Sequence, residues 1–282
     1  MKTEKTSIGP TLKYPGSKWN IAKWIISYIP PHTTYLEPFF GSGAVFFNKE
    51  PSKVETINDI DGNVVNLFKV IRDYPEKLAT LIEFTPWARQ EYTQILTKAG
   101  EDEYFIHTDD PIEDARRFLV RTWQAFGTKT SGRSGWRNDI QGKKGTSCPA
   151  QWANLPNRIL FTAKRLKHAQ IECRSAFKII EAYRYPNVLI YADPPYPRQT
   201  ISGRLYAYDM TDEDHIKLLD ALDAHPGPVI VSGYACSLYD DRLSHWVKKV
   251  KQARAEFGKK REEIIWINPV AAKSIFIQGV VQ

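Results

Sequence analysis

Strand patterns alternate with helical patterns along the chain, and this alternation limits the fold more than any other feature. Residues 34–37 and 54–58 have the length and apolar content of short strands. The apolar positions of residues 64–71 recur at the spacing of an amphipathic helix, and residues 44–48 look like the start of another helix. Strand, helix, strand, helix is the order of a parallel α/β sheet.

The same alternation returns in the second half of the chain. Residues 170–173, 188–192 and 229–232 are predicted strands. A helix is predicted over 212–224, with Thr211 as its N-cap and an acidic residue three positions later.

The chain ends differently, because residues 246–250 and 264–267 are β-like and a basic turn joins them. This arrangement predicts an antiparallel hairpin at the end of the sheet.

Between the two α/β segments, residues 85–166 break the alternation. Helical patterns over 89–98 and 112–126 precede a loop over 127–150 that is rich in Gly, Ser, Lys and Arg. Loops of that length are usually functional or disordered. We therefore expect a catalytic domain formed by 1–84 and 167–282, with 85–166 as a mostly helical inserted region.

Composition narrows the class of protein. The 282 residues are 42% hydrophobic and 25% charged, as in globular chains. Residues 1–13 lack the apolar core of a signal peptide and no run is long enough to span a membrane, so a soluble cytoplasmic protein is expected. Three widely spaced cysteines predict neither disulfides nor a zinc site, and a net charge of +7 favours an acidic partner.

The first chemical motif follows strand 34–37 and reads Glu37-Pro-Phe-Phe-Gly-Ser-Gly43. Glycines at a strand-to-helix turn let the backbone approach a ligand closely. The dinucleotide fingerprint needs a third glycine where Phe46 stands, so nicotinamide and flavin cofactors are disfavoured. Asp59 ends the next strand and is placed to accept a hydrogen bond from a ribose hydroxyl. The alternative is an ordinary glycine turn with a helix-capping aspartate.

The second motif, Asp193-Pro-Pro-Tyr196, follows the apolar strand 188–192. Two prolines stiffen the backbone and remove N–H groups, so carbonyl and carboxylate oxygens can converge on an amino group while the tyrosine offers a flat face. This set suits a planar exocyclic NH2 on a base displaced from a duplex. The alternative is a proline-stiffened turn after a core strand.

The third motif is Lys13-Tyr-Pro-Gly-Ser-Lys18. It does not match the phosphate-binding loop, because Gly16 is followed by serine where that pattern has lysine, and no strand precedes it.

In this order the three motifs resemble the Dam-like DNA adenine-N6 methyltransferases, and the resemblance extends from about residue 12 to about residue 268. It implies a Rossmann-like methyltransferase fold dependent on S-adenosylmethionine, with a seven-stranded mixed sheet, an antiparallel last strand and an inserted recognition region. It implies Asp193, Pro194, Pro195 and Tyr196 as the site that receives the target adenine. The cofactor-binding residues that it implies are Tyr14, Lys18, Glu37, Phe39, Gly41, Gly43, Asp59, Phe177 and Asp193.

The chain departs from the family pattern before Phe177. Members often carry an acidic residue there, which meets the cofactor's adenine, whereas this chain has Ala176. Phe177 keeps the ring for stacking. The inserted region also differs from the stretch associated with GATC recognition, so the target sequence is left open.

The expected reaction is direct methyl transfer to adenine N6, with no metal and no covalent enzyme intermediate. Asp193 and the Pro194 carbonyl would accept the two N6–H bonds and stabilise the charge that develops on nitrogen. Cytosine-C5 chemistry needs a nucleophilic cysteine, and Cys148 stands in the basic loop, where we expect an incidental exposed thiol.

Duplex DNA is the expected partner, with no membrane, no metal, and a monomer as one acceptable state. The inserted loop carries Lys and Arg for phosphates, and Arg and Asn for purine edges. The residues predicted to bind DNA are Lys129, Arg133, Arg137, Asn138, Lys143 and Lys144. The alternative is a solvated basic loop.

Two other functions fit the same residues. RNA adenine or another planar amide could present its NH2 to Asp193 and Tyr196. A DNA-binding module without catalysis, which keeps S-adenosylmethionine as a ligand, is the remaining alternative.

Overall fold

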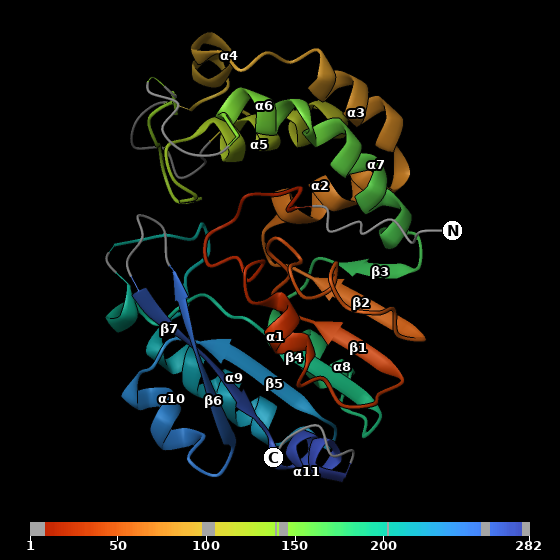
Figure 1. Cartoon of the computed structure of the whole chain (residues 1–282), viewed down its shortest axis with the longest axis vertical. Coiled ribbons are helices and arrows are strands. Elements are labelled where there is room, and N and C mark those ends of the chain that lie inside the picture. Colours follow the sequence, from red (N-terminus) through yellow and green to blue (C-terminus); the bar gives the residue numbers. More distant parts are fainter. Residues whose placement is uncertain are drawn as a thin grey trace. The chain divides into compact units, whose positions relative to one another are not determined.

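The chain divides into two compact units in the computed structural model, which describes residues 9–97, 105–138, 140, 146–201, 203–254 and 260–277 (Figure 1). The helical unit consists of Met1–Ser17, Asp61–Lys167 and Leu205–Ala207. The sheet unit consists of Lys18–Ile60, His168–Arg204 and Tyr208–Gln282. The predicted inserted region, 85–166, lies within the helical unit, which begins earlier in the chain than that prediction.

The sheet unit is built on seven strands in the order β3-β2-β1-β4-β5-β7-β6. Their bounds are β1 (Thr34–Glu37), β2 (Val54–Asn58), β3 (Ala169–Glu172), β4 (Val188–Ala192), β5 (Val229–Gly233), β6 (Val247–Arg254) and β7 (Lys260–Ile267). The first five strands in this order pair in parallel, whereas β7 pairs antiparallel with both β5 and β6. This is the expected mixed sheet with an antiparallel terminal hairpin.

The sheet order reverses at β1 and β4, which are parallel neighbours. From β1 the chain adds β2 and then β3 on one side, and β4 and β5 follow on the other. In open α/β sheets, ligands bind beyond the carboxyl ends of the strands at such a reversal. The segments after β1 and β4 are the two that carry the glycine motif and the Asp193 motif.

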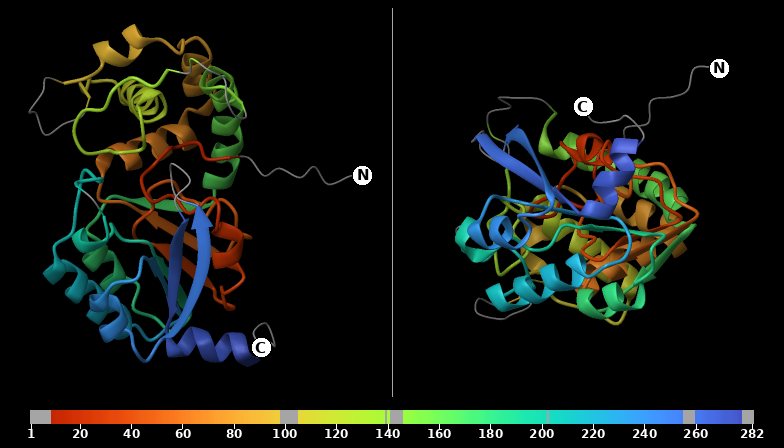
Figure 2. Two further views of the ribbon diagram at one scale, coloured as in Figure 1. Left: turned by 60° about the vertical axis from the view of Figure 1, so that its left-hand side comes forward. Right: turned by 90° about the horizontal axis from the view of Figure 1, so that it is seen from below.

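The main core of the sheet unit lies on one face of the sheet. Alternate residues of β4, among them Val188 and Ile190, and Val231 of β5 pack with helices α8 (Ala176–Ala182) and α9 (Asp212–Asp223). Helix α10 (Ser237–Arg242) adds Tyr239 to the same cluster. Figure 2, in its right-hand view, shows α1 (Ala22–Ile26) and α11 (Pro269–Ile277) on the opposite side of the sheet.

Helix α9 begins as the sequence predicts. Thr211 is its N-cap, and a capping box joins the Thr211 side chain to the Asp214 backbone and the Asp214 side chain to the Thr211 backbone. Such reciprocal bonds satisfy two N–H groups that the first helical turn leaves open.

The helical unit packs α2 (Gly62–Asp73) against α5 (Pro111–Gln124) and α7 (Leu155–Leu166). Its other helices are α3 (Pro75–Glu83), which packs on α7, α4 (Arg89–Gln94) and α6 (Cys148–Ala153).

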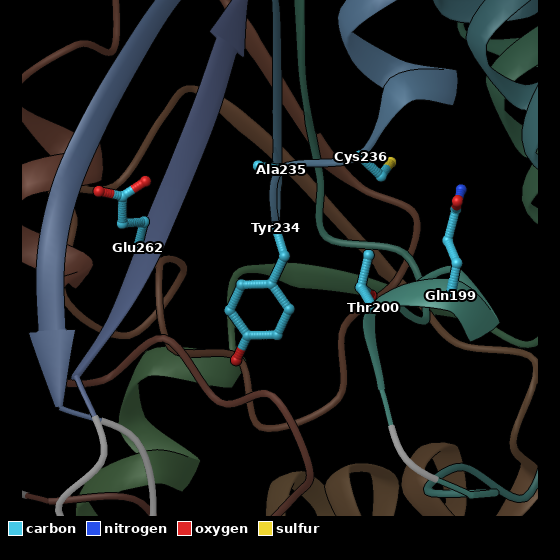
Figure 3. Close-up of a pocket in the computed structure, with 6 residues that line it drawn as sticks. All are labelled: Gln199, Thr200, Tyr234, Ala235, Cys236 and Glu262. Carbon is cyan, nitrogen blue, oxygen red and sulfur yellow. The ribbon is translucent and has the colours of Figure 1, made fainter.

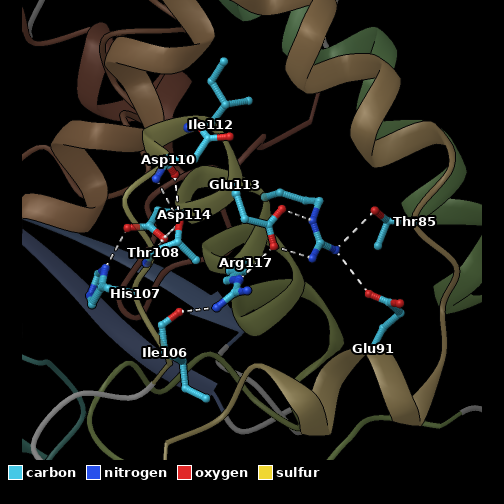
Figure 4. A network of polar contacts seen from close by, with 11 residues as sticks. Thr85, Glu91, Ile106, His107, Thr108, Asp110, Ile112, Glu113, Asp114 and Arg117 are labelled. Atoms are coloured by element: carbon cyan, nitrogen blue, oxygen red, sulfur yellow. Dashed lines mark hydrogen bonds and ion pairs between the residues drawn. The ribbon is translucent and has the colours of Figure 1, made fainter.

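A polar network holds the start of α5 (Figure 4). Asp110 caps the helix, and the Arg116 guanidinium donates to the Glu113 carboxylate at 2.6 and 2.7 Å. The same guanidinium donates to Glu91 at 3.2 Å and to Thr85 at 3.4 Å, so it joins α5 to α4 and to the segment before α4.

Several predicted boundaries were wrong. Residues 44–48 form hydrogen-bonded turns and no helix, since their backbone bonds mix two spacings: the Phe47 N–H donates to the Gly43 carbonyl and the Asn48 N–H to the Val45 carbonyl. Helix α4 ends at Gln94, short of the predicted 98, since the Ile95 carbonyl accepts from the Ile106 N–H. The terminal hairpin is longer than predicted because polar pairs such as Lys251 and Glu263 continue the ladder.

Candidate active site

The Asp193 motif lies at the carboxyl end of β4, directly beside the end of β5. Because β4 and β5 are parallel neighbours, the residues that follow them lie at the same edge of the sheet. Asp193 to Tyr196 follow β4, Ser232 stands near the end of β5, and Tyr234 follows it. All of these residues belong to the sheet unit.

Lys18 is the centre of the polar contacts at this edge. Its Nζ lies 2.8 Å from Asp193 Oδ1, 3.8 Å from Glu263 Oε2, and donates to the Tyr196 hydroxyl at 2.5 Å. The lysine side chain is 2% exposed. Burial lowers the pKa of Lys18, but the neighbouring carboxylates of Asp193 and Glu263 outweigh burial, and the net pKa is raised. The ammonium therefore keeps its proton.

The Asp193 carboxyl is held by one of its two oxygens. Its Oδ1 accepts from Lys18 and, at 2.8 Å, from the Ser232 hydroxyl. Among the described residues no donor bonds to Oδ2, and the side chain is 19% exposed. Burial raises the pKa of Asp193, while the bonds from Lys18 and Ser232 oppose that rise.

An aromatic pair covers part of this cluster. The rings of Tyr196 and Tyr234 have centroids 4.2 Å apart and planes inclined at 37°. Tyr234 also lines a cavity of about 340 Å³, together with residues from the segments after β4 and β5 and from β7. Figure 3 shows these lining residues: Gln199, Thr200, Tyr234, Ala235, Cys236 and Glu262.

Glu37, at the end of β1, anchors the glycine motif. Its carboxyl accepts from the Tyr35 hydroxyl at 2.7 Å and from the backbone N–H of Phe46. Burial raises the pKa of Glu37 to about 8, against the opposing bonds from Tyr35 and Phe46. The carboxyl is therefore mostly protonated at neutral pH.

Asp59 fixes the glycine loop from the neighbouring strand. Its Oδ2 accepts from the backbone N–H of Gly41 at 2.8 Å. Gly43 has a φ of 65°, and a Cβ added there would lie 2.4 Å from Cζ of Phe40. Only glycine fits that position without a shift of the aromatic ring.

The other predicted cofactor residues are distributed over both units. Phe39 and Phe177 are half-buried against the main core, after β1 and β3 respectively. Tyr14 belongs to the helical unit, where its ring lies 6.3 Å from that of Tyr206. Lys18 belongs to the sheet unit and contacts Asp193.

Sequence reasoning missed Ser232, Tyr234 and Glu263. The first two could have been found, because Ser232-Gly-Tyr234 ends an apolar strand at the edge where the other motifs lie. Glu263 carries no comparable pattern, since it is one of several charged residues in the terminal hairpin.

The basic loop begins as an ordered turn in the helical unit. Ala125 and Trp136 form an antiparallel bridge, and the buried Arg121 donates to the carbonyl of Gly132 at 2.7 Å. Of the residues predicted to bind DNA, Lys129, Arg133 and Asn138 are exposed and Arg137 is half-buried. Lys143 and Lys144 lie outside the described residues.

Cys148 differs from expectation. It is buried, 5% exposed, at the first position of α6, so the prediction of an exposed thiol was wrong. The proline that follows it opens α6, and that helix carries the cysteine into the core of the helical unit.

The residues that the structure describes contain no cluster of three or more His, Cys, Asp or Glu side chains that could hold a metal ion. Nor does any of their helices have the length and apolarity needed to cross a membrane.

Comparison with known proteins gives consistent matches. Residues 14–260 match the family model for D12 class N6 adenine-specific DNA methyltransferases. The chain is 28% identical over 233 residues to the type II methyltransferase M.MjaIII of Methanocaldococcus jannaschii, covering 75% of this chain and 78% of that protein. It is 23% identical over 277 residues to the DNA adenine methylase of Salmonella typhi, covering 90% and 91%. A DNA N-6-adenine-methyltransferase of Escherichia phage P1 is 26% identical over 220 residues, 76% of this chain and 28% of that protein.

Proposed function

Because the chain belongs to the family of D12 class N6 adenine-specific DNA methyltransferases, we propose that it moves a methyl group from S-adenosylmethionine to N6 of a flipped-out adenine in duplex DNA, at a specific sequence. The names of the relatives, DNA adenine methylase and type II methyltransferase, support DNA as the substrate. The arrangement of Asp193 carries the assignment of the site.

Asp193 has the contacts that an acceptor for an amino group requires. Lys18 and Ser232 bond to Oδ1 and fix the carboxyl group, while no donor among the described residues bonds to Oδ2. An adenine NH2 in reach of this group would donate one hydrogen to Oδ2 and the other to the Pro194 carbonyl. These two bonds favour a pyramidal nitrogen and stabilise the positive charge that develops on it.

The aromatic residues and the cavity give the base a place to lie. Tyr196 and Tyr234 provide ring surfaces beside Asp193, and the cavity of about 340 Å³ on Tyr234 has the size of a small-molecule site. Taking a base out of the stack costs a few kcal/mol, which stacking and edge hydrogen bonds in such a pocket offset.

The residues at the ends of β1, β2 and β3 fit S-adenosylmethionine. The positive φ of Gly43 shapes a tight turn that leaves backbone groups available to a ligand, and Asp59 places a carboxylate beside the backbone of Gly41. Phe39 and Phe177 supply half-buried rings against which an adenine can stack. Glu37 holds this loop in place, and Tyr14 and Lys18 complete the proposed set. When bound, S-adenosylmethionine supplies a methyl group activated by its sulfonium.

The basic loop of the helical unit is the proposed contact with the duplex. Its exposed side chains, Lys129 and Arg133, suit phosphate oxygens, and Arg137 and Asn138 have the donors and acceptors that read purine edges. Lys143 and Lys144 continue the same basic segment in the sequence.

The test begins with the purified chain, S-adenosylmethionine and unmethylated genomic DNA. The DNA is digested to nucleosides, N6-methyladenine is quantified by mass spectrometry, and the modified sites are mapped by single-molecule sequencing. We expect N6-methyladenine at one short motif. Absence of N6-methyladenine from DNA despite cofactor binding contradicts the proposal and directs the search to RNA or to a non-catalytic DNA-binding role.

A substitution then tests the assigned acceptor. Asp193→Ala removes both carboxyl oxygens and is expected to abolish turnover while leaving cofactor affinity within a few-fold of the original value. Glu213→Ala, an exposed change in α9, serves as the control and should keep full activity. Near-normal methylation by Asp193→Ala would show that another group accepts the N6 hydrogens.

A further inference from the structure

Two buried hydroxyl groups lie next to Asp193 in a series, and the proposed function uses only the bond of the first, Ser232, to the carboxyl group. Ser232 lies on β5 and Tyr191 on β4, and each is 1% exposed. The Ser232 Oγ is 2.8 Å from Asp193 Oδ1 and 2.9 Å from the Tyr191 hydroxyl oxygen. The three residues therefore form a hydrogen-bonded line that ends on the carboxyl group.

The direction of each hydrogen bond in this line follows from the number of protons. Serine has one hydroxyl hydrogen, and it is donated to the Asp193 carboxylate. The Ser232 oxygen can then only accept from Tyr191, so the tyrosine must donate. Burial raises the pKa of Tyr191 well above its usual range, and the nearby Asp193 adds to that rise, so Tyr191 keeps the hydrogen that it donates.

Two donors of different kinds thus meet at Oδ1. Lys18 reaches it from the segment before α1, and Ser232 reaches it from β5. One donor alone leaves a carboxylate free to turn about its Cβ–Cγ bond, whereas two donors from separate elements hold both its position and its plane. The fixed plane determines where Oδ2 lies.

We propose that Ser232, supported by Tyr191, is a positioning residue that fixes Oδ1 of Asp193 together with Lys18 and so reserves Oδ2 for the amino group of the target base. This inference rests on the proposed function, because it assigns the bond that Asp193 makes with its substrate. Ser232 and Tyr191 act through Asp193 and do not touch the base.

The Ser232 and Tyr191 hydroxyl groups are expected to add little to the stability of the folded chain. Strand β5 is Val-Ile-Val-Ser-Gly and is buried along its length, so a smaller apolar side chain fits position 232. Replacing both partners of a buried hydrogen bond by apolar groups of similar shape is nearly neutral for stability, whereas a carboxylate that loses a donor is left short of one bond. A role in positioning therefore predicts a loss of turnover that exceeds any loss of stability.

The experiment compares four variants of the full chain: Ser232→Ala, Ser232→Cys, Tyr191→Phe, and Ser232→Ala combined with Tyr191→Phe. For each, kcat and KM for DNA and for S-adenosylmethionine are measured, together with the melting temperature. Ser232→Ala is expected to lower kcat about 10- to 100-fold with KM within a few-fold, because one hydrogen bond to a charged group is lost. Ser232→Cys keeps the shape but has a weak donor, and is expected to recover only part of that loss.

The double variant tests whether Tyr191 acts on Asp193 only through Ser232. Tyr191 acts only through Ser232, so Tyr191→Phe alone should lower kcat about 3- to 10-fold, yet add nothing once Ser232 is alanine. The matched control is Tyr183→Phe, which removes another tyrosine hydroxyl bonded to a hydroxyl partner, Thr56 on β2, a strand that β1 separates from β4. This control should keep the original kcat.

The outcomes distinguish a failure of this inference from a failure of the proposed function. No adenine methylation by the unmodified chain overturns both. Methylation by the unmodified chain with an unchanged kcat in Ser232→Ala overturns this inference alone. A loss that appears in KM and melting temperature but not in kcat, or losses that multiply in the double variant, also overturn it.

Discussion

Replacing Glu37 by glutamine should change how the stability of the chain depends on pH. The Glu37 side chain is buried, 2% exposed, and accepts from the Tyr35 hydroxyl. Burial is the largest cause that raises its pKa to about 8, and the nearby Asp193 adds to it. In the unfolded chain the same carboxyl titrates near 4.5.

The sign of the effect follows from proton binding. Between pH 4.5 and pH 8 the folded chain keeps a proton at Glu37 that the unfolded chain releases. The folded state therefore binds more protons, and this residue makes the free energy of unfolding fall as the pH rises. Each pH unit is worth about 1.4 kcal/mol at most, so Glu37 lowers the free energy of unfolding by about 3 kcal/mol between pH 5 and pH 8. Glutamine does not titrate, and Glu37→Gln removes that decrease.

Urea unfolding at pH 5, 6, 7 and 8 measures the free energy of unfolding of the unmodified chain and of Glu37→Gln. The effect is the difference between their two curves of free energy against pH. Other titrating groups contribute equally to both curves and cancel. Glu55→Gln is the matched control, because Glu55 lies on the next strand and pairs with Lys49 at 2.5 Å. It should lower stability while keeping the fall with pH. Parallel curves for the unmodified chain and Glu37→Gln would refute the argument that Glu37 is protonated in the folded chain.

Four more substitutions have defined outcomes. Gly43→Ala combines a φ of 65° with a Cβ 2.4 Å from a Phe40 ring atom, so we expect a loss of about 2–4 kcal/mol in urea unfolding and weaker S-adenosylmethionine binding by calorimetry. Arg137→Ala should reduce discrimination between cognate and altered DNA sequences, whereas Lys129→Ala should weaken binding to all sequences evenly and reduce the salt slope by about one; equal losses on every sequence for Arg137→Ala would rule out base contact. Thr211→Ala removes the capping box of α9 and should cost about 1 kcal/mol, seen as a melting temperature lower by about 2–4 °C at unchanged kcat.

Much of the sheet could be predicted from the sequence because its strands are short apolar runs. The predicted bounds of β1, β2 and β4 agree with the structure, and α9 begins at its predicted cap. The prediction was wrong for residues 44–48, where a short pattern is compatible with either a helix or a series of turns. Residues 44–48 resemble a helix start in sequence, but their backbone hydrogen bonds form turns that do not continue as a helix.

Some residues of the candidate site could likewise be predicted from the sequence, and others could not. Asp193 and Tyr196 could be predicted because a rigid motif follows a buried strand. Ser232 could have been found at the end of an apolar strand, whereas Glu263 became visible only when the sheet order placed β7 beside β5. One acid in a charged hairpin has no pattern that separates it from a solvated residue, so the contact of Glu263 with Lys18 depends on the tertiary fold.

The helical unit is assembled from three separate segments of the chain, so the loop proposed to contact DNA belongs to a unit that cannot be exchanged between relatives as one continuous block. The Trp123 indole donates to the Thr11 carbonyl at 2.8 Å, and the backbone N–H of Thr130 donates to the Leu205 carbonyl at 2.9 Å. A transplanted block of residues 61–167 alone would arrive without either partner. Chimaeras that alter specificity will therefore need the segments around Thr11 and Leu205 to travel with the block, so the graft has three pieces.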